Sequence, residues 1–138
     1  METVMIITLA NLHKATKQQI FNQVATHLLT QKKQAKIINE TGTFCRYRIP
    51  NTNLKCAGGC IIADLEYDET CETRTWHDAI KLYILDFPYC NRHENFIGNL
   101  QSIHDSLDPS EWKKSLYQLT RDEKLDSTCL LDFNEINK

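Results

Sequence analysis

Six cysteines and five histidines give this sequence most of its chemical potential. Cys56 and Cys60 are four positions apart, so on a helix they would lie on one face. Cys45 lies upstream, and His104 could complete a tetrahedral set of zinc ligands. Zinc sites usually contain Cys-x-x-Cys or His-x3-His pairs, and the sequence contains neither. Two hypotheses therefore stand: a small zinc-binding protein using Cys45, Cys56, Cys60 and His104, or cysteines that are simply small buried residues. No cofactor other than zinc is expected.

A cysteine nucleophile is a further hypothesis, and it would make the protein a hydrolase or transferase. Cys56 or Cys60 at a helix start would have a lowered thiol pKa, and His104 would act as the base. Neighbouring residues on a helix point about 100° apart, so Asp105 is not expected to orient His104. His104 also falls on an apolar stripe, where a hydrogen-bonded core histidine is the simpler interpretation.

A small basic and aromatic cluster is a candidate binding site, formed by Arg46, Tyr47, Arg48 and Lys55. A guanidinium on a strand can bind a carboxylate or phosphate through two hydrogen bonds. The alternative is a set of surface ion pairs with the acidic residues of segment 64–72, and we favour it for Arg48. Arg46 stays undecided, because the strand alternation places it on the same face as Phe44.

The apolar pattern predicts an α+β fold that is mostly helical, with four to five helices and one small antiparallel β-hairpin. Thr16 and Gln19 form a capping box that should begin the first helix, and Asp108 with Pro109 should begin the last. The hairpin is expected within residues 35–49. Further helices are expected around Trp76–Ile84 and Phe96–Leu107, and a short buried helix is expected after the glycine pair at 58–59.

The length of 138 residues is typical of one domain, so residues 1–138 are treated as a single unit. Residues 1–15 are expected to form an N-terminal arm, either an edge strand or irregular. Residues 125–138 are expected to be a loosely ordered tail that either docks or frays.

Composition excludes several classes of function. Sixteen Lys and Arg stand against eighteen Asp and Glu, so the net charge is −2 and a nucleic-acid partner is not expected. No apolar run is long enough to cross a membrane. The start of the sequence, with Glu2 and an interrupted apolar stretch, does not resemble a signal peptide. We therefore expect a cytoplasmic protein, in a bacterium or a host cell, with mostly reduced cysteines.

The segment from Cys45 to Tyr67 carries a family resemblance. Its Cys45-Arg46-Tyr47-Arg48 element, followed by Lys55-Cys56-Ala57-Gly58-Gly59-Cys60, resembles a family of small uncharacterised phage and prophage proteins. The similarity extends over about residues 16–120 and includes Leu100-Gln101-Ser102-Ile103-His104-Asp105 and Trp112. The resemblance implies a phage or prophage setting, and it implies no activity.

Together these observations favour a small accessory or regulatory protein that binds a partner macromolecule, most simply a host or viral protein. The alternative is an enzyme or zinc protein centred on Cys45, Cys56, Cys60 and His104. An enzyme is the less favoured of the two.

Overall fold

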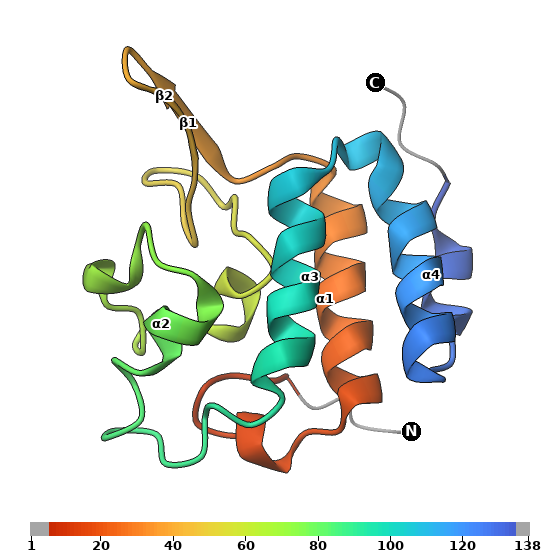
Figure 1. The fold of residues 1–138 in the computed structure, drawn as a ribbon, viewed down its shortest axis with the longest axis horizontal. Coiled ribbons are helices and arrows are strands. Elements are labelled where there is room, and N and C mark those ends of the chain that lie inside the picture. The colour runs from red at the N-terminus through yellow and green to blue at the C-terminus, as the bar shows by residue number, and fades with distance from the viewer. Residues whose placement is uncertain (1–5, 135–138) are drawn as a thin grey trace.

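The computed structural model describes residues 6–134, and three helices form its main layer (Figure 1). They are α1 (Lys17–Gln31), α3 (Glu94–Ser106) and α4 (Trp112–Glu123). Helices α1 and α3 run in the same direction, while α4 runs in the opposite direction beside them. The short helix α2 (Trp76–Ile80) and the surrounding loops pack on the other side of α3. The prediction of a mostly helical α+β fold is confirmed.

Helix α1 begins where the sequence predicts. The Thr16 side chain accepts a hydrogen bond from the Gln19 N–H, and the Gln19 side chain accepts one from the Thr16 N–H. These reciprocal bonds satisfy two backbone donors that have no partner within the helix. The residue after the helix, Lys32, has a left-handed backbone (φ 61°) that turns the chain toward the hairpin.

The other predicted helices are present with different lengths. Helix α2 ends at Ile80, and the chain then continues in turns rather than reaching Ile84. Tyr83 is buried and its hydroxyl accepts a hydrogen bond from the Asp68 N–H, a contact that holds this turn against a distant loop. After the glycine pair the structure forms only a 3-10 turn, Gly59–Ile61. Asp108 caps a 3-10 turn, Pro109–Glu111, that leads directly into α4.

Both flanking segments pack against the helical layer where the structure describes them. The arm is irregular apart from a 3-10 turn at Leu12–Lys14, and Leu12 is buried. The tail forms a 3-10 turn at Thr128–Asp132 that packs against α1 and buries Leu130. Residues 1–5 and 135–138, which belong to the expected arm and tail, lie outside the described residues. Within 6–134, no helix combines the length and the apolar character that a membrane crossing needs.

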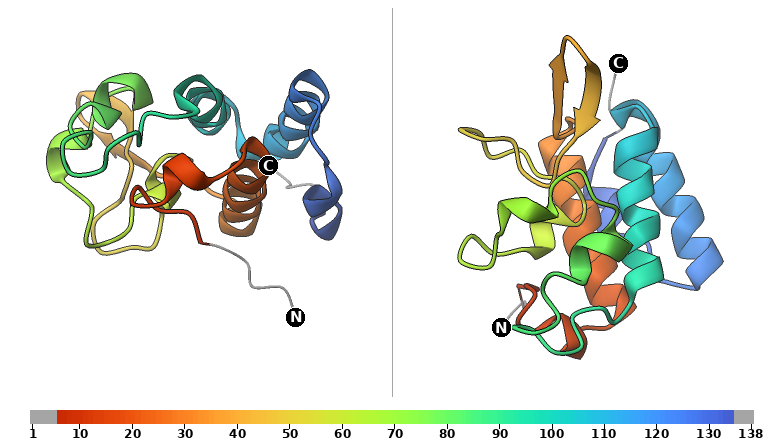
Figure 2. Two further views of the ribbon diagram at one scale, coloured as in Figure 1. Left: turned by 90° about the horizontal axis from the view of Figure 1, so that it is seen from below. Right: turned by 60° about the vertical axis from the view of Figure 1, so that its left-hand side comes forward.

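The hairpin projects from the body of the molecule (Figures 1 and 2). Strand β1 (Lys36–Asn39) pairs antiparallel with β2 (Gly42–Cys45), and Ile37 lies opposite Phe44. Nothing among residues 6–134 covers either face of this two-stranded sheet, and most of its residues are exposed. Its two ends at the root, Ala35 and Cys45, lie near the last turn of α3, where the candidate site is found.

Candidate functional site

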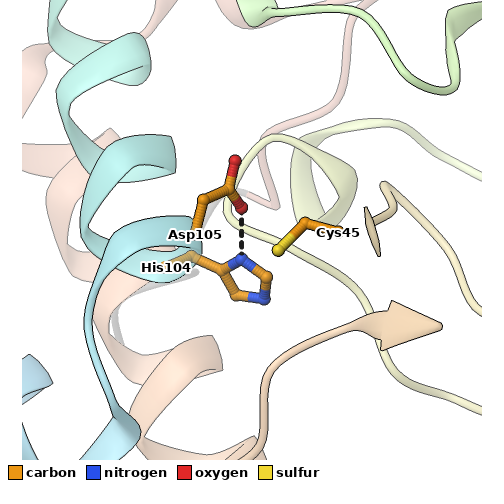
Figure 3. Close-up of side chains that lie close together, drawn as sticks. All are labelled: Cys45, His104 and Asp105. Carbon is orange, nitrogen blue, oxygen red and sulfur yellow. Dashed lines mark hydrogen bonds and ion pairs between the residues drawn. The ribbon is translucent and has the colours of Figure 1, made fainter. Parts of the chain in front are cut away.

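His104 lies in the last turn of α3 and has no exposed surface. Its ring stacks on Trp112 of α4, with 5.5 Å between ring centroids and 27° between the planes. Cys45 and Asp105 point toward the same place, as Figure 3 shows. The ligand atoms of Cys45, His104 and Asp105 all lie within 4.8 Å of one another.

Both ring nitrogens of His104 are already engaged. The Nε2 atom lies 2.9 Å from the buried backbone N–H of Ala35, which donates a hydrogen bond to it. The Nδ1 atom lies 2.7 Å from Oδ1 of Asp105. Because an N–H group points at Nε2, that atom must be the acceptor, so Nδ1 carries the proton and donates it to the carboxylate. His104 is therefore a neutral ring with a fixed tautomer.

The expectation that Asp105 would not orient His104 is wrong. Although neighbouring side chains on a helix point about 100° apart, the imidazole of His104 turns its Nδ1 side toward the adjacent carboxylate, so the two groups meet (Figure 3). Asp105 also accepts a hydrogen bond of 3.0 Å from the Gln101 side chain, one turn earlier in α3. The carboxylate is thus the centre of the cluster, a role the sequence analysis did not assign to it.

The Cys45 thiol, at the end of β2, completes the cluster. Burial, the negative charge of Asp105 and a hydrogen bond to that carboxylate raise the pKa of Cys45 to about 11. A nucleophilic cysteine needs the opposite shift, because the thiolate is the reactive species. No free nitrogen of His104 is left to remove the thiol proton. The cluster has the residue types of a catalytic triad in an arrangement that keeps the thiol protonated.

The cluster is also poorly arranged for zinc. A metal-bound histidine normally donates its second ring N–H to an acceptor. Here the second nitrogen, Nε2 of His104, faces the Ala35 N–H, which is itself a donor. Binding a metal at Nδ1 would place two donors against each other or require an imidazolate. The residues present do not suit a resident metal without loss of the Ala35 hydrogen bond.

Cys56 and Cys60 are held elsewhere by local contacts. The Cys56 sulfur accepts a hydrogen bond of 3.3 Å from the Gly59 N–H, and the Cys60 thiol donates one of 3.1 Å to the Ala57 carbonyl. Burial raises the pKa of both thiols, that of Cys60 to about 12. Among residues 6–134, neither belongs to a group of three metal-ligating side chains. The structure therefore brings Cys45 and His104 together and leaves Cys56 and Cys60 outside the cluster, and all six cysteines are free thiols.

The basic residues of the candidate binding site are engaged with the acidic segment. Arg48 forms an ion pair of 2.7 Å with Asp64 and lies 4.6 Å from the ring centroid of Tyr67. Lys55 lies 3.9 Å from the same carboxylate of Asp64. Arg46 is 3.7 Å from Glu72 and 3.9 Å from Glu69. The ion-pair interpretation favoured for Arg48 describes its contact with the exposed Asp64, whereas Arg46 lies nearest to the buried Glu72, and Tyr47 is also buried.

Glu72 is the residue that organises this region, and the sequence analysis missed it. It is only 7% exposed and accepts hydrogen bonds from the Tyr47 N–H (2.8 Å), the Arg48 N–H (3.2 Å) and the Tyr67 hydroxyl (2.6 Å). A buried carboxylate with three donors and a nearby guanidinium is well compensated. Its position in a run of acidic residues gave no sign of burial.

The hairpin carries apolar side chains that nothing in residues 6–134 covers. Ile38 is 71% exposed and Phe44 is 43% exposed, and they lie on opposite faces of the two strands. The sequence held one available signal: Ile37 and Ile38 are adjacent on a strand, so they must point to opposite faces and both faces must be partly apolar.

Comparison of the chain with protein-family models, with curated proteins and with solved structures finds no match.

Proposed function

We propose that this protein is a small accessory or regulatory protein that acts by binding, and that its partner is a protein that docks on the β1–β2 hairpin. The observation that carries the proposal is the exposure of Ile38 and Phe44 on a hairpin that projects from the body. A two-stranded sheet with both faces in water is marginally stable, and a third covering element stabilises it.

The reactive side chains already form hydrogen bonds and ion pairs within the protein, and this supports binding over catalysis. His104 has both nitrogens hydrogen-bonded, and the Cys45 thiol is held protonated. The basic side chains of the candidate site are paired with Asp64, Glu69 and Glu72. These hydrogen bonds and ion pairs hold the hairpin and the loops in place, so the groups act in stabilising the fold.

A protein partner is favoured over nucleic acid by the nature of the exposed surface. The net charge of −2 provides no general attraction for phosphates, whereas exposed Ile and Phe side chains are typical anchors of protein interfaces. The phage resemblance of the Cys45–Tyr67 segment would make the partner a host or viral protein in the cytoplasm.

The proposal is tested by residue-specific crosslinking. A photoreactive phenylalanine analogue replaces Phe44 in one version of the chain and Leu131 in another, in cells that naturally carry the gene. Leu131 is the matched control because it is also exposed (70%) and apolar but lies in the tail, away from the hairpin. A protein adduct formed from position 44 and absent from position 131 is the expected result.

The partner protein is identified from the adduct and purified on its own, and its binding to the uncrosslinked chain is then measured. Ile38→Thr with Phe44→Thr keeps good strand formers and removes the apolar anchors, so the dissociation constant should rise at least tenfold, while Leu131→Thr should leave it unchanged. Identical adducts from positions 44 and 131, or equal affinities for the two variants, would overturn the proposal.

A further inference from the structure

Strand β1 has an outer edge that no strand of residues 6–134 covers. The sheet has two strands, and β1 pairs with β2 alone. The Arg46 N–H donates to the Ala35 carbonyl, and the register places Ile37 opposite Phe44. Since hydrogen bonding alternates along an antiparallel pair, the backbone groups of Ile37 face β2 and those of Lys36 and Ile38 face outward. These outward groups can accept another strand.

The edge carries opposite charges at its two ends. Lys36 begins β1 at the root, and Glu40 follows β1 at the tip, with Ile38 midway between them. Both charged residues are exposed, and neither forms an ion pair with another residue of the described chain. Four residues of strand span about 13 Å, which exceeds the screening length of about 8 Å at physiological salt. Lys36 and Glu40 therefore do not neutralise each other within one chain.

We propose that β1 binds β1 of a second copy of this chain, antiparallel, around a two-fold axis through Ile38. This register places Ile38 opposite Ile38 of the second copy. It also places Lys36 opposite Glu40 of the second copy, and Glu40 opposite its Lys36. The register agrees with the direction of the backbone groups, because Lys36 and Ile38 both face outward. The charge pattern is thus self-complementary, as a two-fold interface requires.

Pairing would convert two exposed hairpins into one four-stranded sheet, β2–β1–β1–β2. Three or more strands with an apolar face are the usual minimum for a stable isolated sheet. The Ile37 and Phe44 pairs of both copies would then lie on one face of this sheet. The inference rests on the proposed function, because this wider sheet presents Phe44 on one face and Ile38 on the other to the protein partner.

The dimer is weak in the absence of that partner. An edge of about five residues buries far less than the roughly 800 Å² per partner of a standard stable interface. The hairpin projects from the helices (Figure 2), so a second hairpin can approach its edge. Self-association should therefore appear at high protein concentration.

The experiment is a charge-swap complementation on the purified full chain. Sedimentation equilibrium up to about 1 mM measures the dimer dissociation constant of wild type, Lys36→Glu, Glu40→Lys and an equimolar mixture of the two variants. Each variant alone places like charges opposite each other at two positions, so its dissociation constant should rise about tenfold or more. The mixture restores both opposite-charge pairs and should dimerise as strongly as wild type.

Lys33→Glu is the matched control, because it makes the same charge change at an exposed residue before the strand begins. It should leave the dissociation constant within about twofold of wild type. Circular dichroism and amide spectra verify that each variant is folded. A wild type that stays monomeric at 1 mM, or a mixture no stronger than its components, would overturn the inference. That result would leave the proposed function intact, because the position-44 crosslink reports a different protein and needs no dimer.

Discussion

The buried hydrogen bond between Ala35 and His104 allows a prediction in which two similar substitutions give different results. A glutamine side chain can place its carbonyl oxygen near the Nε2 position of a histidine, and an asparagine can place its amide N–H₂ near the Nδ1 position. His104→Gln therefore keeps an acceptor for the Ala35 N–H. His104→Asn keeps a donor for Asp105 and leaves the Ala35 N–H without an acceptor.

The expected costs follow from burial. Ala35 is completely buried, and a buried N–H left without a partner costs about 1–3 kcal/mol. The side chain of Asp105 is 36% exposed, so water can replace part of its lost hydrogen bond. We expect the free energy of unfolding to fall by about 1 kcal/mol for His104→Gln and by about 2–4 kcal/mol for His104→Asn. His104→Phe keeps the stacking on Trp112 and loses both bonds, so it should resemble the asparagine variant.

Urea unfolding followed by tryptophan fluorescence measures these differences, because Trp112 lies against the substituted ring. Hydrogen exchange of the Ala35 amide provides an independent readout at the atom concerned. Exchange should accelerate much more in His104→Asn than in His104→Gln. If the asparagine variant is as stable as the glutamine variant or more stable, the assignment of Nε2 as the acceptor is incorrect.

Two further predictions concern the thiol cluster and the close contacts of glycine. Because the pKa of Cys45 is about 11 in the folded protein, its alkylation rate should keep rising about tenfold per pH unit from 8 to 10, where the rate of an ordinary thiol levels off. Asp105→Asn removes the negative charge beside the thiol, so it should lower the pKa of Cys45 and increase the rate at pH 8. Mass spectrometry of the labelled peptide measures both rates. A Cβ at position 59 would lie 2.1 Å from the Tyr47 carbonyl oxygen, so Gly59→Ala should lower the thermal midpoint by several degrees, whereas Gly98→Ala, with no atom within 4 Å, should leave it unchanged or raise it. A rate for Cys45 that levels off near pH 9, or equal midpoints for the two alanine variants, would contradict these expectations.

Local signals in the sequence were sufficient for the element boundaries that depend on adjacent residues. Thr16 and Gln19 begin α1 because both partners of the capping box lie within one turn. Asp108 and Pro109 begin the turn that leads into α4 for the same reason. Helix α2 is shorter than its apolar spacing predicts, and beyond its end Tyr83 contacts Asp68, a residue in a different loop. Spacing along one element carries no information about such a contact.

The candidate site was only partly predictable for a similar reason. Cys45 and His104 were both named from their chemistry, and the fold does bring them together. The roles of Asp105 and of the Ala35 N–H depend on side-chain rotation and on a backbone donor 69 positions away. Cys56 and Cys60 were grouped with them because a regular helix was assumed. The glycine pair instead allows a tight turn, in which each of the two sulfur atoms forms a hydrogen bond with a nearby backbone group.

The contact between α1 and the tail also has a consequence for the order of events during synthesis. Gln18 and Asp126 exchange two hydrogen bonds across 108 residues of chain, at 2.9 and 2.7 Å. A ribosome adding about 5–20 residues per second needs roughly 5–20 s to travel from one to the other. During that interval the α1 surface that Leu130 will cover has no covering segment. A ribosome pause before residue 126 would therefore prolong the time for which that surface of α1 is uncovered and open to aggregation.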